Sequence, residues 1–273
     1  MAATGAGPVG ETRGMPDLPV QYFPGRDAAQ LAYREVGEGP AVVLIHGYFS
    51  SAFVNWVRYG HAASIAARGF RVIMPDLRGH GDSAKPHDAA AYPPDVLADD
   101  GFALLEHLGL TQYALGGYSL GGRTTIRMLA RGAAPGRAVV AGMGLDGVVD
   151  ATGRNEHFRR ILTNLGTFDR RSPEGKAEAF LKSTGADPVA ALYLLDAAVD
   201  TPPEALAKID VPVLVLAGLE DDDNGPAEDL ADAFPRGLAA RIPGNHMSAV
   251  TQPDLGAAIG AFLAVAPEPP PRG

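Results

Sequence analysis

Short, unbroken apolar runs recur along the chain and alternate with longer stretches of mixed character. The clearest runs are residues 41–47, 71–76, 113–119, 138–146 and 211–218. Continuous apolar runs of this length are typical of strands that are buried on both faces, as in a parallel sheet. The hydrophobic pattern therefore predicts a central sheet whose strands are mostly parallel.

The stretches between these runs carry the composition and the end signals of helices. Residues 52–69 form one candidate, which stops at Gly69, and residues 93–109 form another. The second candidate opens with two prolines and closes with Gly109, which is the order expected at the start and the end of a helix. Strands that alternate with helices predict an α/β fold with helices on both faces of the sheet.

One long segment, residues 147–208, interrupts this alternation because it has helical stretches and no apolar run of the strand type. We therefore expect one core, made of residues 19–146 and 209–265, with a helical lid inserted between its late strands. An ordinary helical crossover is the alternative, but a segment of about 60 residues is longer than a simple crossover needs.

Composition limits the function classes more than it limits the fold. The chain has 273 residues, of which 46% are hydrophobic and 20% are charged, as is usual for a globular protein with a sizeable core. The net charge of −9 argues against binding to nucleic acid or to an anionic membrane surface, because both require basic patches. The absence of cysteine excludes disulfides, thiolate catalysis and cysteine-based metal sites.

The longest apolar runs and the two ends of the chain give expectations about location. No run of 18 apolar residues is present, so no membrane span is expected. The first residues lack the basic and apolar regions of a secretory signal, which predicts a cytoplasmic protein. Residues 1–18 and 266–273, rich in small residues and proline, are expected to be disordered tails.

Residues 116–122 read GGYSLGG and place Ser119 among four glycines, which predicts either a flexible loop or a sharp turn. The turn is favoured because the segment fits G-x-S-x-G between a strand candidate and a helical stretch. Such a reversal strains the central residue, and the glycines let the two elements approach closely. It would expose the Ser119 hydroxyl at a helix N-terminus, where backbone N–H groups favour a developing negative charge.

Several stretches in a fixed order together resemble the serine-nucleophile, esterase-like branch of the α/β-hydrolase superfamily. They are HGYFSS at 46–51, PDLRGHGDS at 75–83, GYSLGG at 117–122, LAGLEDDDNG at 216–225 and IPGNHMSAV at 242–250. The resemblance extends over residues 19–263, nearly the whole chain. It implies the α/β-hydrolase fold, with Ser119 as the nucleophile.

A serine nucleophile needs a base, and the base needs a carboxylate to orient it. The resemblance implies His246 as the base, because this histidine follows the last apolar stretch and precedes the last helix candidate. His46 and His80 are expected to have structural roles beside the site. The remaining histidines are expected to be exposed to solvent; they are His61, His87, His107 and His157.

The orienting carboxylate has three candidates. The family usually places this acid three residues after the glycine that ends its strand, which selects Asp221 after Gly218. Asp223 is the second candidate, and Asp146, at the end of the preceding strand, is the third because some relatives carry the acid there. The acidic stretch also resembles a calcium loop, but its twelfth position is Ala231, which offers no carboxylate, so no metal is expected.

An acyl transfer also needs donors for the oxyanion of the tetrahedral intermediate. The resemblance implies the backbone N–H groups of Tyr48 and Leu120, and each such donor typically contributes about 3 kcal/mol. The ring of Tyr48 either contacts substrate or serves only in packing. Asp76 and Arg78 are expected to hold the loop after their strand through an internal ion pair and backbone hydrogen bonds, and not to act in catalysis.

These features predict a serine hydrolase that cleaves a carboxylic ester of a small molecule with an apolar part, without a cofactor. Lactonase, thioesterase, carbon–carbon bond hydrolase and acyltransferase activities would use the same residues, and the fold does not decide among them. The alternative outside the class of enzymes is a non-catalytic homologue that binds a small molecule. Haloalkane dehalogenases and epoxide hydrolases of this fold use an aspartate at the position of the nucleophile, so a serine at position 119 argues against both functions.

Overall fold

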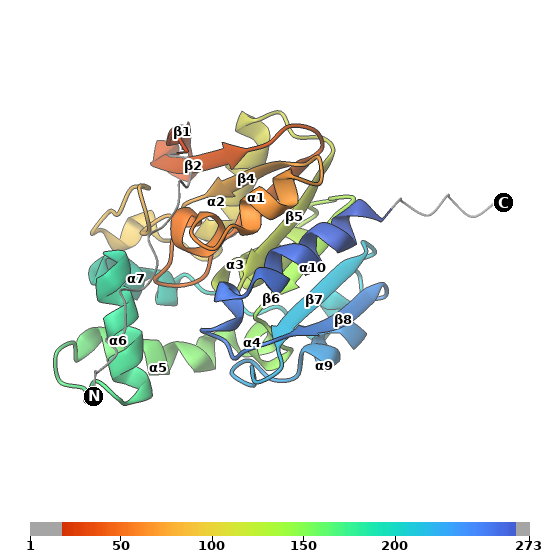
Figure 1. Ribbon diagram of the computed structural model, residues 1–273. Coiled ribbons are helices and arrows are strands. Elements are labelled where there is room, and N and C mark those ends of the chain that lie inside the picture. The colour runs from red at the N-terminus through yellow and green to blue at the C-terminus, as the bar shows by residue number, and fades with distance from the viewer. Residues whose placement is uncertain (1–17, 266–273) are drawn as a thin grey trace, which may run out of the picture.

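The computed structural model describes residues 18–265 (Figure 1). The tails predicted at 1–18 and 266–273 lie outside the described residues, apart from Leu18, which packs against the core. Within the described range no helix combines the length and the apolar character that a membrane crossing requires.

A single eight-stranded sheet forms the centre of the described chain, in the spatial order β1-β2-β4-β3-β5-β6-β7-β8. Strand β2 is antiparallel to both β1 and β4, and all other neighbouring pairs are parallel. The predicted α/β fold with a mostly parallel sheet is confirmed. The strands are β1 Gln21–Pro24, β2 Gln30–Val36, β3 Ala41–Ile45, β4 Arg71–Pro75, β5 Tyr113–Tyr118, β6 Arg137–Ala141, β7 Val213–Gly218 and β8 Gly237–Ile242.

Helices cover both faces of this sheet, as Figure 1 shows. Val42 and Leu44 of β3 pack in a cluster with α1 and α10, whereas Val43 and Ile45 pack on the other side with α2 and α3. The alternation follows from the two-residue period of a strand. The helices are α1 His61–Ala66, α2 Val96–His107, α3 Leu120–Ala130, α4 Asp146–Val149, α5 Ala151–Thr163, α6 Pro173–Thr184, α7 Pro188–Asp196, α8 Pro203–Leu206, α9 Ala227–Asp232 and α10 Pro253–Ala264.

The helix expected over residues 52–69 is broken in the structure. A π-helix covers Phe53–Val57, and α1 begins only at His61. Gly60 lies between them with a φ of 79°, a left-handed conformation that ends one helix and lets the next begin at a new angle.

The segment between β6 and β7 consists of helices α4 to α8, and α5, α6 and α7 stand together at one side of the sheet (Figure 1). An apolar cluster joins these helices to the loop after β3. Phe49 of that loop packs with Leu162 of α5, Leu181 of α6 and Leu195 of α7. The same loop approaches Ser119, so the inserted helices meet the sheet next to the candidate nucleophile.

Candidate active site

The turn between β5 and α3 holds Ser119 in a strained backbone conformation, with φ 54° and ψ −114°. A side chain at Gly117 would place its Cβ 2.3 Å from the carbonyl carbon of Gly121. A side chain at Gly121 would place its Cβ 2.1 Å from the carbonyl oxygen of Ile45. The glycines are therefore required by close backbone contacts, and the segment is a tight turn and not a flexible loop.

Three loops at one edge of the sheet bring Ser119, His246 and Asp221 together. The Oγ of Ser119 lies 3.0 Å from Nε2 of His246. On the other side of the ring, Nδ1 lies 3.2 and 3.3 Å from the two carboxylate oxygens of Asp221. The carboxylate of Asp221 is buried and the imidazole is half-buried. With the proton on Nδ1 donated to Asp221, the lone pair of Nε2 faces the serine hydroxyl.

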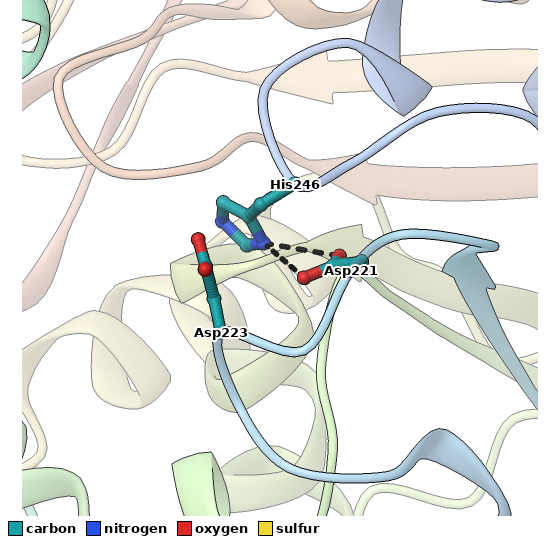
Figure 2. Close-up of side chains that lie close together, drawn as sticks. All are labelled: Asp221, Asp223 and His246. Atoms are coloured by element: carbon teal, nitrogen blue, oxygen red, sulfur yellow. Dashed lines mark hydrogen bonds and ion pairs between the residues drawn. The ribbon is translucent and has the colours of Figure 1, made fainter. Parts of the chain in front are cut away.

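The other two candidate acids lie differently. Asp223 is exposed, and its carboxylate stands beside the imidazole on the side away from Asp221 (Figure 2). Donor atoms of Asp221, Asp223 and His246 lie within 4.8 Å of one another, a spacing that a metal ion could bridge. The hydrogen bond between Nδ1 and Asp221 accounts for the closest of these contacts. Asp146 is exposed at the start of α4, against Gly225.

The loop after β3 lies directly against the turn that carries Ser119. A Cβ added at Gly47 would be 3.4 Å from the Cβ of Ser119. The buried Asn55 accepts a hydrogen bond from the Gly47 amide at 3.0 Å, and Nδ1 of His46 lies 2.8 Å from the Gly47 carbonyl oxygen, so both peptides of Gly47 are held. Leu120 begins α3, where the first N–H groups of a helix have no intrahelical partner. Tyr48 and Leu120, the predicted oxyanion donors, thus lie in the two segments that meet at Ser119, and no motif indicated the contact of Asn55 there.

Tyr118, the residue before Ser119, also holds the site together. The hydroxyl of Tyr118 donates to the carbonyl oxygen of His246 at 2.6 Å and so joins the loop of His246 to the turn at Ser119. Asn224 donates to the carbonyl oxygen of Gly142 at 3.1 Å and ties the acid loop to the end of β6. These contacts join distant loops, and only the adjacency of Tyr118 to Ser119 could have suggested one of them.

Two chambers meet at Ser119 and His246, and Tyr48 lines both of them. The first, which we call the charged chamber, has a volume of about 100 Å³. The second, the uncharged chamber, has a volume of about 170 Å³. The charged chamber is also lined by Asp95, Arg123, Arg127, Asn155, Phe158, Leu194, Leu195 and Asp223. The uncharged chamber is also lined by Val54, Asn55, Tyr59, Phe180, Met247, Val250 and Thr251.

His46 and His80 form a buried pair beside the site, with ring centroids 5.1 Å apart. Nε2 of His46 accepts from the amide of Leu77 at 3.0 Å, and Nε2 of His80 accepts from the amide of Phe49 at 3.2 Å. Burial lowers the pKa of both rings, and the unfavourable proximity of a second imidazolium lowers the pKa of His80 further, to about 3. Both rings are therefore neutral acceptors that hold loops, as the sequence predicted.

The expected ion pair between Asp76 and Arg78 is wrong. Asp76 is bound by Arg34 at 3.2 Å and by the amide of Ala52 at 2.7 Å. Arg78 is fully buried and binds the carboxylate of Asp100 through Nε at 2.8 Å and Nη2 at 2.9 Å. Both side chains are structural, but each finds its counter-charge on another element because they leave their loop in different directions.

The prediction for the remaining histidines is wrong at one position. His61 is buried where α1 packs on α10, and its Nε2 lies 2.7 Å from the carbonyl oxygen of Val250. His87, His107 and His157 are exposed, as expected. The partner of His61 is 189 residues away, so no local pattern could indicate it.

Comparison with known proteins identifies the family. Residues 40–190 match the model of the alpha/beta hydrolase fold. The chain belongs to the alpha/beta hydrolase fold family. Among curated relatives, this hydrolase is 38% identical over 97 residues to bifunctional epoxide hydrolase 2 of Sus scrofa. That match covers 36% of this chain and 17% of the porcine protein, so the chain spans only a minor part of that relative.

Solved structures of the family superpose over most of this hydrolase. An esterase from Thermogutta terrifontis matches with a TM-score of 0.72 and 26% identity, over 90% of this chain and 98% of the other. A bromoperoxidase from Bacillus anthracis matches with a TM-score of 0.73 and 26% identity, over 90% of this chain and 100% of the other. The similarity therefore extends through the inserted helices as well as the sheet.

Proposed function

We propose that this alpha/beta hydrolase is a serine hydrolase that cleaves a carboxylic ester through an acyl-enzyme on Ser119. One observation carries the proposal. The hydroxyl of Ser119, the imidazole of His246 and the carboxylate of Asp221 form a continuous hydrogen-bonded series, with contacts of 3.0 and 3.2 Å. This is the arrangement in which a neutral imidazole accepts the serine proton while a buried carboxylate stabilises the imidazolium.

The reaction proceeds in two displacements. His246 accepts the Oγ proton as Oγ attacks the acyl carbon, and the resulting oxyanion collapses with cleavage of the ester C–O bond. The proton on Nε2 passes to the departing alkoxide, which leaves as the alcohol. His246 then takes a proton from water as its oxygen attacks the acyl-enzyme, and the acid leaves as the proton returns to Ser119.

The neighbourhood of Ser119 supports the remaining assignments. The N–H groups of Tyr48 and Leu120 are the oxyanion donors in this proposal. The contact of 2.8 Å between Nδ1 of His46 and the carbonyl oxygen of Gly47 keeps the peptide that carries the Tyr48 N–H oriented. Residues 147–208 act as a lid, since Phe158 of α5 and Leu194 of α7 line the charged chamber. The apolar residues that line the chamber fit a substrate with an apolar part. The proposed reaction uses no cofactor or metal.

The residue at position 119 distinguishes the proposed function from the activities for which the curated relatives are named. Several are named epoxide hydrolases, and one from Burkholderia is named a fluoroacetate dehalogenase. The family resemblance implies an aspartate nucleophile in the haloalkane dehalogenases and epoxide hydrolases of this fold, so a serine at position 119 favours acyl chemistry. Lactones, thioesters, carbon–carbon bonds and acyl transfer remain chemistries of the same three residues.

The test is intact-mass analysis after treatment with a fluorophosphonate. The wild type is expected to gain one adduct, and Ser119→Ala is expected to gain none. Ser50→Ala, which removes a serine from the wall of the uncharged chamber, is the matched control and should still be labelled.

A panel of esters, thioesters and lactones then defines the acyl compound. A folded wild-type protein that is not labelled and turns over no member of the panel would refute the serine hydrolase. Stoichiometric binding of a panel member without turnover would instead establish the non-catalytic binding homologue.

A further inference from the structure

The two chambers differ in charge. Apart from His246, which both share, the described residues that line the uncharged chamber include no ionisable acid or base other than tyrosine. Those described for the charged chamber include two arginines, Arg123 and Arg127, and two aspartates, Asp95 and Asp223. A substrate that occupies both chambers therefore meets a neutral wall on one side of Ser119 and ionic groups on the other.

One ion pair in the charged chamber is complete within the protein. Arg127 donates to the carboxylate of Asp95 through Nε at 2.8 Å and Nη2 at 2.5 Å. Its Nη1 donates to the carbonyl oxygen of Asp200 at 3.1 Å. Arg131 approaches the same Asp95 carboxylate at 3.6 Å from outside the chamber. The negative charge of Asp95 is thus bound by protein cations and is not directed at a ligand.

Arg123 occupies a different place, one helical turn after the nucleophile on α3. Arg123 and Ser119 both line the charged chamber, so the Arg123 side chain and the Ser119 hydroxyl belong to the wall of one cavity. Burial raises the pKa of Tyr48, and the charges of Arg159 and Arg123 lower it in part, so the Arg123 charge acts where Tyr48 lines the site. The apolar neighbours Phe158 and Leu194 strengthen any ionic contact made there.

We propose that Arg123 binds an anionic group of the substrate, and that the natural substrate is an ester of a short dicarboxylic acid whose free carboxylate lies in the charged chamber. This inference rests on the proposed ester hydrolysis. Arg is suited to the role because its planar guanidinium binds a carboxylate through two parallel hydrogen bonds. The uncharged part of the ester occupies the other chamber, between Val54 and Phe180.

The size of the charged chamber limits the length of the acid. Its volume is about 100 Å³, which has room for a carboxylate and a linker of only a few carbons. Monoesters of four- to six-carbon diacids therefore fit better than longer ones. Asp223 lies beside His246 and also lines the charged chamber. Its negative charge repels the substrate carboxylate and so weakens binding.

The test compares ethyl monoesters of succinate, glutarate and adipate with the matching monoamide esters, which have the same shape without the charge. The readout is the ratio of kcat/KM for the acid to kcat/KM for the amide. The wild type is expected to prefer the acid. Arg123→Met is expected to lower the ratio by about 10- to 100-fold, since a charge-assisted hydrogen bond is lost. Arg123→Lys should retain part of the preference.

Two further variants separate this role from a structural one. Asp223→Asn should raise the ratio, because it removes a repulsive charge. Arg137→Met, the same substitution at a residue of β6 that lines neither chamber, should leave the ratio at the wild-type value. A ratio that does not fall in a folded Arg123→Met protein would overturn the proposal, whatever happens to the absolute rates.

Binding to Ser119→Ala tests the inference independently of catalysis. Calorimetry should detect tighter binding of the glutarate monoester than of its amide, and adding Arg123→Met should abolish the difference. If the wild type is neither labelled by fluorophosphonate nor active while this difference persists, the hydrolase assignment fails and the anion site stands. Equal binding of acid and amide to Ser119→Ala would refute the anion site alone.

Discussion

Two polar clusters at the same edge of the sheet both contain histidine and aspartate, but only one of them faces the two chambers beside Ser119. The other, which we call the buried cluster, consists of His46, Asp76, Arg78, His80 and Asp100. In the buried cluster, Nε2 of His46 and of His80 accept backbone N–H groups, so their lone pairs are occupied. In the series of Ser119, His246 and Asp221, Nε2 faces a hydroxyl that lies between two chambers. The presence of histidine and aspartate therefore does not identify a reactive site. What distinguishes the two clusters is whether the lone pair on Nε2 is already bonded to a backbone N–H group or faces a hydroxyl beside a cavity.

The largest effect that distinguishes the clusters is expected at Asp221. Asp221→Asn should lower kcat by about 10⁴-fold, because an amide favours the wrong tautomer of His246 and does not stabilise the imidazolium. Asp223→Asn is the matched control on the same loop and should change kcat for a neutral ester by less than tenfold. Steady-state kinetics of both variants decide the matter. Equal losses would mean that the two carboxylates share the orienting role.

A substitution in the buried cluster should affect stability first. Arg78→Met leaves the buried carboxylate of Asp100 without its charge partner and should lower the free energy of unfolding by about 3–5 kcal/mol. Arg71→Met removes a partly exposed pair with Glu35 and should cost less than about 1 kcal/mol. Urea unfolding measures both. If Arg78→Met were no more destabilising than Arg71→Met, the buried network would not be structural.

The buried cluster should also make stability depend on pH. The pKa of His80 is about 3 in the folded protein and about 6.5 when unfolded. Because the folded value is the lower one, the contribution of the neutral ring is complete above pH 6.5 and is lost as the pH falls toward 3. Between pH 7 and pH 5 this ring should account for about 2 kcal/mol of lost stability.

Urea unfolding at both pH values, for the wild type and His80→Asn, tests that contribution. The variant should show a shallower dependence on pH than the wild type, even if it is less stable at pH 7. The exposed His107 provides the control, since His107→Asn should keep the wild-type slope. Identical slopes in all three proteins would exclude His80 as the source.

The smallest effect is expected at the rim of the buried cluster. Arg34 contacts Asp82 at 2.6 Å, but the Asp82 side chain is 47% exposed, so the pair is screened by solvent. Asp82→Asn should therefore change the free energy of unfolding by less than about 1 kcal/mol. Asp76→Asn, at the buried end of the same network, should destabilise the protein more. The reverse order in urea unfolding would contradict the distinction between rim and interior.

Local patterns predicted the parts of the molecule that local sequence controls. The apolar runs gave β3 to β7, because a strand buried on both faces needs apolar residues at every position. The flanking glycines indicated the turn at Ser119, because that backbone tolerates no side chain beside it. Strands β1, β2 and β8 carry partly exposed residues at the antiparallel or outer side of the sheet, so their signal is weaker.

The contacts that cross the fold were not predictable in the same way. Arg78 finds Asp27 and Asp100 at separations of 51 and 22 residues, and His61 finds Val250 at 189. Such pairs depend on how elements pack, which spacing along the chain does not report. Asn55, Tyr118 and Arg123 also reach the site through the packing of distant elements, so the sequence alone did not indicate them.

The order of the site along the chain has a consequence for synthesis. Ser119 is separated from His246 by 127 residues, and the helical insertion between β6 and β7 lies within that interval. At the roughly 5–20 residues per second of ribosomal translation, His246 emerges about 6 to 25 seconds after Ser119. Under the proposed mechanism, a nascent chain therefore carries the serine and the inserted helices before it carries the histidine that would accept the serine proton. The proposed hydrolysis can begin only after the loop that follows β8 has been made.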